Sequence, residues 1–272
     1  MAYKSILVQV NDDPACRPRL RAAIELGTRF DAHIIGLYVR QGLRIPTTAE
    51  IHDGSGLLEA QTAELQRLER KAHAIFSETM ASYTGPGYEW RVDDGIADEV
   101  FRQHSAYIDL LVVSLDKDQP KSYLISEEVL IGTARPVLLL PKNDSDQPVG
   151  HRVVAAWRNS REAARAINDA LPFLQSASTV EVVTCIPPAS DTQHIADNIS
   201  VHLARHGITA TTSSITCPKS QVGAALLDKV RDFRSDLLVM GAYGHSRLRE
   251  TVWGGTTDYI LSHIDVPVFM SH

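Results

Sequence analysis

Residues 236–257, DLLVMGAYGHSRLRETVWGGTT, carry the strongest structural pattern in this chain. They begin with a continuous apolar run, as in a strand buried on both faces of a parallel sheet, and pass through four glycines into a helix start. Residues 109–114 open in the same way, as DLLVVS, but no glycine follows them before Gly132. The chain therefore reads as one structural unit written twice, and the second copy alone keeps the glycine loop.

Strand patterns alternate with helical patterns along both halves, and the apolar residues of the helical patterns recur every three or four positions. One such helical pattern runs from Ala163 to Leu174. Strands that alternate with helices form parallel sheets, so we expect an α/β fold of two tandem, doubly wound, five-stranded parallel-sheet domains. The expected strands are residues 6–10, 33–39, 88–92, 109–114 and 136–140 in the first half, and 153–157, 179–185, 208–215, 236–240 and 266–270 in the second.

A short polar segment, KNDSDQPVG at residues 142–150, separates the two copies. Such a segment is typical of a linker, so the predicted domains are residues 1–142 and 151–272. Residues 45–58 form an additional connection in the first half, with no counterpart of equal length in the second half.

Composition and charge exclude several classes of protein. The 272 residues include 27 Lys and Arg against 33 Asp and Glu, a net charge of −6, which argues against a nucleic-acid partner. No apolar run approaches the roughly 20 residues of a membrane-spanning helix, and the first residues do not resemble a signal peptide. Three cysteines without a Cys-x-x-Cys pair are typical of reduced thiols. We therefore expect a cytoplasmic protein without a membrane partner.

The glycine loop predicts an anion site. Gly241 and Gly244 follow a strand, at the sheet edge where doubly wound proteins bind ligands, and we expect them to adopt left-handed conformations that let a phosphate approach. Gly254 and Gly255 precede a helix, whose free N–H groups and dipole attract anions. Thr256 and Thr257 offer hydroxyl donors, and His245 and Arg247 are candidate phosphate neighbours. The alternative is that the glycines only make tight turns.

With this loop the chain resembles the universal stress protein family, specifically its tandem two-domain members. The family pattern Gly-x2-Gly-x9-Gly-(Ser/Thr) occurs as Gly241, Gly244 and Gly254, with Gly255 in the hydroxyl position. The resemblance implies an adenine nucleotide alpha hydrolase-like fold that binds ATP, with or without Mg, in the second domain. The residues implied to contact the nucleotide are Ala156, Trp157, Cys185, Ile186, Met240, Gly241, Gly244, Gly254, Gly255, Thr256 and Thr257.

The first half departs from this pattern, because Lys117, Asp118 and Pro120 occupy its loop. We therefore expect residues 1–142 to be a degenerate domain that does not bind ATP and serves as a scaffold. The resemblance also implies that the last strands of the two halves pair within the chain, as a pseudo-dimer. A homodimer of the whole chain remains an open alternative.

Catalytic motifs are missing from the sequence. The chain has no Gly-x-Ser-x-Gly nucleophile motif, and no lysine follows the last glycine as in a P-loop. The expected function is therefore that of a stress-response regulator or sensor that binds adenine nucleotide, and not that of a fast enzyme. Two alternatives remain: an interaction protein with a vestigial pocket, favoured by Arg158 in place of the family's aspartate and by Gly255, and a slow ATP hydrolase.

A metal site is not expected. His202 and His206 stand four residues apart on a helical pattern, with His194 further upstream, and solvated histidines are favoured over a zinc site.

Overall fold

The computed structural model describes residues 2–40, 54–114, 127–141, 148–188, 195–242 and 255–272. The first half contains β1 (Ser5–Gln9), α1 (Cys16–Phe30), β2 (His33–Arg40), α2 (Gly54–Met80), β3 (Tyr88–Asp94), α3 (Ala97–Ser105), β4 (Leu110–Ser114), α4 (Glu127–Gly132) and β5 (Val137–Leu140). The second half contains β6 (Arg152–Trp157), α5 (Arg161–Asp169), α6 (Leu171–Ser176), β7 (Thr179–Ile186), α7 (Ile195–Arg205), β8 (Ala210–Thr216), a 3₁₀ turn (Lys219–Gln221), α8 (Val222–Asp232), β9 (Leu237–Gly241), α9 (Thr256–His263) and β10 (Val268–Ser271).

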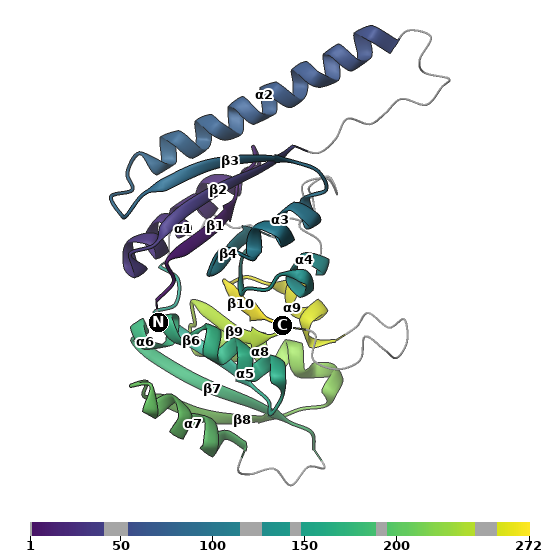
Figure 1. Ribbon diagram of the computed structural model, residues 1–272. Coiled ribbons are helices and arrows are strands. Elements are labelled where there is room, and N and C mark those ends of the chain that lie inside the picture. Colours follow the sequence, from purple (N-terminus) through teal and green to yellow (C-terminus); the bar gives the residue numbers. More distant parts are fainter. Residues whose placement is uncertain (1, 41–53, 115–126, 142–147, 189–194, 243–254) are drawn as a thin grey trace.

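The strands form one ten-stranded sheet in the order β3-β2-β1-β4-β5-β10-β9-β6-β7-β8 (Figure 1). Every neighbouring pair is parallel except β5 and β10, which run antiparallel where the two halves meet. The predicted α/β class with doubly wound halves is confirmed. The two five-stranded units are joined edge to edge, so that they share a continuous sheet.

Helices cover both faces of the sheet because the strands are apolar on both sides. Ile6 and Val8 belong to one buried cluster, together with Leu20 of α1, whereas Leu7 between them belongs to the other, together with Phe101 of α3. This alternation places α1 and α3 on opposite faces. The same division continues in the second half, where α5, α6 and α7 contribute to the first cluster and α8 and α9 to the second.

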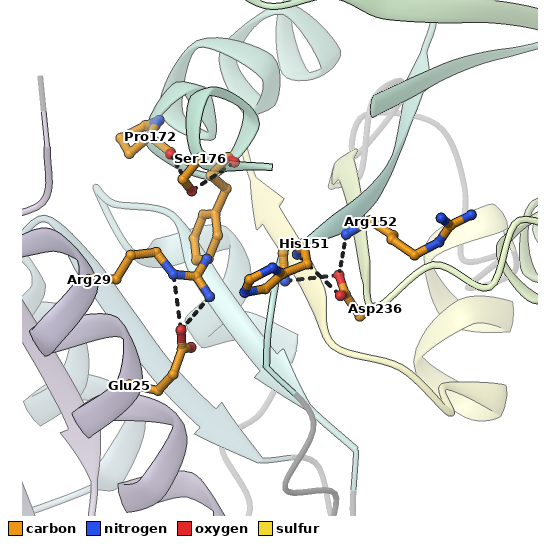
Figure 2. Close-up of polar contacts among 9 residues, drawn as sticks. Glu25, Arg29, His151, Arg152, Pro172, Ser176 and Asp236 are labelled. Carbon is orange, nitrogen blue, oxygen red and sulfur yellow. Dashed lines mark hydrogen bonds and ion pairs between the residues drawn. The ribbon is translucent and has the colours of Figure 1, made fainter. Parts of the chain in front are cut away.

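One carboxylate contact is repeated in both halves. The Asp109 side chain accepts the backbone N–H groups of Lys4 at 2.7 Å and Ser5 at 3.0 Å. The Asp236 side chain accepts three backbone N–H groups from residues 150–152, at 2.9 to 3.2 Å (Figure 2). Burial raises the pKa of Asp236, and these backbone donors act against that rise. In each half, the Asp before the Leu-Leu-Val strand therefore holds the start of the half's first strand.

The junction between the halves contains a buried aromatic cluster. Tyr3 and Phe30 come from the first half, and Phe173 and Phe269 from the second, with neighbouring ring centroids 5.1 to 5.7 Å apart. The Tyr3 hydroxyl donates to the backbone carbonyl of Asp169 at 2.6 Å. Because each half supplies two rings, neither half has a complete core at this place without the other.

Charged groups also cross the junction. Arg29 is paired with Glu25 four residues earlier on α1 (Figure 2). Its guanidinium lies 5.9 Å from the ring centroid of Phe173 on α6. Arg165 of α5 donates to the carbonyl of Ala134, which follows α4, at 3.0 Å. These contacts fix α5 and α6 against elements of the first half.

The helical pattern expected from Ala163 to Leu174 is divided into α5 and α6. Pro172 lies in the first turn of α6, where its missing N–H group costs least. In a continuous helix the proline ring would clash with the carbonyl group four residues earlier, so the first helix ends at Asp169.

Across the described ranges, none of the helices combines the length and apolar character needed to span a membrane.

Candidate functional site

The ends of β9, β6 and β7 lie side by side at the carboxyl edge of the second half. β6 is flanked by β9 and β7, so the strand order reverses next to it, which is the usual ligand position in doubly wound sheets. Six of the expected contact residues lie on these strand ends: Ala156, Trp157, Cys185, Ile186, Met240 and Gly241. Gly255, Thr256 and Thr257 begin α9. Gly244, His245, Arg247 and Gly254 lie outside the described residues.

The strand-end residues do not all face the same way. Ala156, Cys185 and Met240 pack with the apolar cluster that α8 and α9 cover. Trp157 packs with the cluster on the opposite face, and Ile186 follows Cys185 in β7, so its side chain also turns to that opposite face. The structure therefore brings together an apolar wall of Ala156, Cys185 and Met240 beside α9, without Trp157 and Ile186.

Gly241 serves a packing purpose. A Cβ atom at this position would lie 2.6 Å from the backbone carbon of Glu162 and 2.7 Å from the nitrogen of Ala163, so only a glycine lets β9 approach the start of α5. Gly241 is also not among the glycines with positive φ in the described chain. The expectation of a left-handed conformation is therefore wrong for Gly241. Close contact with α5 accounts for the residue.

The first turn of α5 is filled by its own side chains. The Ser160 hydroxyl accepts the N–H of Ala163 at 3.3 Å, as an N-terminal cap does. A hydrogen bond from its own backbone N–H lowers the pKa of Glu162, against the effect of burial, with further contributions from Ser160, Arg161 and His272. The helix end that faces Gly241 thus already holds a carboxylate. Sequence reasoning missed Glu162, although a serine cap followed by an acidic residue in the first helical turn is a recognisable sign.

The start of α9 is open by comparison. Its N-cap residue, Gly255, is exposed and extended, with φ −152° and ψ −171°, and no side chain caps the helix. Among the described residues, a Cβ atom at Gly255 would meet nothing within 4 Å. Neither the backbone conformation of this glycine nor its packing against the described residues requires a glycine here. Thr256 is half-buried and Thr257 is buried.

One group in the first turn of α9 opposes an anion. The Asp258 carboxylate lies in that turn, and its Oδ1 is buried with no hydrogen-bond partner among the described residues. A lone negative charge repels phosphate unless a cation lies between the two. The residues present therefore fit a nucleotide phosphate at Gly255 and Thr256 only if the charge of Asp258 is balanced.

The corresponding corner of the first half is occupied. β1 pairs with β4 as β6 pairs with β9, and in this alignment Arg19 of α1 stands where α5 has Ala166. The fully buried guanidinium of Arg19 donates to the Gln9 carbonyl at 2.6 Å and to Asn11 Oδ1 at 2.7 Å, with Asp13 Oδ2 at 3.8 Å. A long side chain therefore fills the space behind the β1 end. Lys117, Asp118 and Pro120 lie outside the described residues.

Two other features lie away from this edge. A cavity of about 290 Å³ is lined by Glu69, Arg70, His73 and Trp90, between α2 and β3 in the first half. The rings of His202 on α7 and of His206, directly after α7, are 4.8 Å apart, and in the described ranges no three His, Cys, Asp or Glu side chains gather as a metal site. His194 is not among the described residues.

Comparisons with known proteins agree with this architecture. The family model of the universal stress protein family matches residues 150–272. A universal stress protein from Archaeoglobus fulgidus is 15% identical, with a TM-score of 0.72 over 98% of this chain and 97% of that chain. An assigned but unproven universal stress protein from Pseudomonas aeruginosa is 17% identical, with a TM-score of 0.63 over 99% of this chain and 93% of that chain. Because of the low identities, these two matches show a shared fold alone.

A half-length match carries no argument. A universal stress protein solved in complex with cAMP aligns with 45% of this chain at 17% identity and a TM-score of 0.36. A search of curated proteins finds no match. Residues 150–272 of the chain match the model of the universal stress protein family, so the second half carries a domain of that family.

Proposed function

We propose that the second half of the chain binds an adenine nucleotide, ATP, and that the bound nucleotide changes the contacts of the protein with its partners during a stress response. The observation that carries the proposal is the open start of α9. A helix end that no described side chain caps, with a glycine that no described neighbour requires, begins the crossover helix from β9 to β10, so it belongs to the side of the sheet where β9 ends. Such an end supplies N–H groups to a phosphate.

The proposed roles follow from the two environments at this edge. Ala156, Cys185 and Met240 offer an apolar wall for the adenine ring. The backbone at Gly255 and the hydroxyl of Thr256 bind phosphate. The Asp258 Oδ1, which has no hydrogen-bond partner among the described residues, suits a Mg²⁺ ion that accompanies the triphosphate, because Mg²⁺ prefers carboxylate oxygen and phosphate ligands.

The proposed role of the first half is that of a scaffold. The buried Arg19 side chain supports this part of the proposal, because it takes up the space behind β1. We further propose that β5 and β10 hold the halves together permanently in solution and that the protein is cytoplasmic, in keeping with its three free thiols. Calorimetry should then give one nucleotide per chain, and two per chain would contradict the scaffold role.

A matched pair of variants at Gly255 tests the site. Gly255→Val retains an extended backbone but places a branched side chain at the helix end, so we expect ATP affinity to fall at least tenfold, which is about 1.4 kcal/mol. Gly255→Ser supplies a favoured cap and a hydroxyl donor, so its affinity should equal or exceed that of the wild type. Isothermal titration calorimetry measures both, with circular dichroism as the control for folding.

Two results would overturn the proposal. Wild-type protein that binds no adenine nucleotide at millimolar concentration would favour an interaction protein with a vestigial pocket. Asp258, which places a carboxylate in the first turn of α9, is the observation that supports this second candidate. Equal ATP affinity in the Val and Ser variants would move the nucleotide away from α9.

Rapid turnover is not proposed. Glu162 places a carboxylate beside Gly241, but its lowered pKa makes it a weak base for activating water. The release of ADP during prolonged incubation of purified protein with ATP would instead establish the slow hydrolase alternative.

A further inference from the structure

The chain has three free cysteines, and two of them lie on neighbouring strand ends. β7 and β8 run parallel, with Cys185 paired to Ile215. Cys217 is two residues beyond Ile215, so its side chain projects from the same face of the sheet as that of Cys185. The N–H of Cys217 donates to the carbonyl of Ile186 at 3.1 Å, which continues the strand pairing as far as the second cysteine.

The two thiols are close enough to act on each other, because Cys217 contributes to the pKa of Cys185. Burial, reinforced by the charge and hydrogen bond of Cys217, raises the pKa of Cys185 to about 12, so the pair retains a proton at neutral pH. Cys185 is half-buried, whereas Cys217 is 7% exposed. Cys16 is fully buried at the start of α1 in the other half and has neither cysteine as a neighbour in its hydrogen bonding.

We propose that Cys185 and Cys217 form a redox-active dithiol, which a peroxide oxidises to an intrachain disulfide. The Cys185 sulfur is the more exposed and attacks one peroxide oxygen as the thiolate, so its raised pKa makes this step slow at neutral pH and faster as the pH rises. The O–O bond breaks and the leaving hydroxide takes up the thiol proton, which gives a sulfenic acid and one water. The Cys217 sulfur then attacks the Cys185 sulfur, which forms the S–S bond and releases a second water. Two electrons pass from the sulfur atoms to the peroxide oxygens, and both thiol protons leave in the waters.

The position of the pair suits this change. Cys185 is the second-last residue of β7, and Cys217 directly follows β8 and precedes Pro218. A disulfide requires the two Cα atoms to lie within about 7 Å, and strand ends adjust to this more easily than strand centres because fewer ladder hydrogen bonds hold them. The interior pairing from Val180 to Thr184 is left intact.

A metal site is a poorer explanation of the pair. A closed zinc site needs four ligands, and in the described chain no third His, Cys, Asp or Glu side chain joins the two thiols. Two neighbouring thiols are sufficient for a disulfide. The proposal does not depend on nucleotide binding, although Cys185 is also part of the apolar wall beside α9.

Thiol counting on the full-length, reduced, nucleotide-free protein tests the proposal. Native protein is treated with hydrogen peroxide, quenched, unfolded and alkylated, and the intact mass gives the number of remaining thiols. The wild type should fall from three thiols to one and stay monomeric on a non-reducing gel. Peptide mapping should find Cys16 alkylated, and Cys185 and Cys217 joined.

The chain contains its own control. Cys16→Ser should fall from two thiols to none, because the reacting pair is intact, whereas Cys185→Ser and Cys217→Ser should each retain both remaining thiols. Circular dichroism checks that each variant folds. Phenylarsine oxide, which bridges two neighbouring thiols, gives a second measurement on the wild type and should block Cys185 and Cys217 together at one equivalent.

The proposal is overturned if the wild type keeps three thiols, if the product is a sulfinic acid or an intermolecular disulfide, or if phenylarsine oxide leaves the pair free.

Discussion

Phe173→Ala tests whether the two halves fold as one unit. The Phe173 ring is fully buried and touches the rings of Tyr3 and Phe30 from the first half and of Phe269 from β10. Removing the ring leaves a cavity on the line where the halves meet. Truncating a buried phenylalanine costs about 3–5 kcal/mol. Each lost aromatic pair adds roughly 0.5–1.5 kcal/mol beyond buried area, so we expect a result near the upper end.

Urea unfolding followed by both tryptophan fluorescence and circular dichroism measures this loss. Because the aromatic cluster belongs to both halves, the variant should unfold in a single transition, with its midpoint lowered and its slope unchanged. The thermal midpoint should fall on the order of 10 °C. Tyr107→Ala is the control, since this side chain is 83% exposed and its removal should change stability by less than about 0.5 kcal/mol.

A loss below about 1 kcal/mol for Phe173→Ala would refute the reasoning, because such a value belongs to surface substitutions. Two separate transitions, with the first half unaffected, would also show that the aromatic cluster does not couple the halves.

Two further substitutions address single contacts. Gly241→Ala should destabilise the protein by about 1–3 kcal/mol, because the new Cβ would overlap Glu162. Gly132→Ala is the control: its Cβ would meet an ordinary neighbour at 3.5 Å, so its stability should be nearly that of the wild type. Equal urea midpoints for the two variants would contradict the packing role of Gly241. Tyr3→Phe should cost about 1–2 kcal/mol through the unpaired carbonyl of Asp169. Burial raises the pKa of Tyr3, so this residue's stabilisation is complete below the unfolded pKa of about 10 and is lost as pH rises beyond it. The Tyr3→Phe variant should therefore lose less stability above about pH 10 than the wild type does. Identical profiles of unfolding free energy against pH for the two proteins would exclude this contribution of Tyr3.

The order of strands and helices could be predicted because it depends on local apolar patterns. The runs around Ile6, Val153 and Leu237 are continuous because these strands are buried on both faces, and buried parallel strands require helical crossovers. Only the resemblance to a family suggested that the last strands pair, since an apolar run does not show which strand it will pair with. Pro172 is a sequence signal for a break between two helices, but the apolar spacing around it favours one continuous helix, and the break was therefore not predicted.

The candidate site was harder to predict because it depends on which face each side chain occupies. Trp157 and Met240 both end strands of the same edge, yet they pack on opposite faces of the sheet. The sequence predicts that Gly241 provides conformational freedom, whereas in the structure the glycine is required because the backbone of Glu162, from a distant segment, packs closely against it. Such contacts join residues about 80 positions apart, a separation at which spacing rules carry no information.

The antiparallel seam between β5 and β10 relates two similar units that belong to one polypeptide. In an assembly of identical copies, every substitution appears in both members at once, so a side chain such as Arg19 would enter both corners together. In this chain the long Arg19 side chain fills the corner of the first half only, because the second half has the small Ala166 at the corresponding position. Covalent linkage thus gives each unit a separate evolutionary history, and one can lose a task without taking it from its twin.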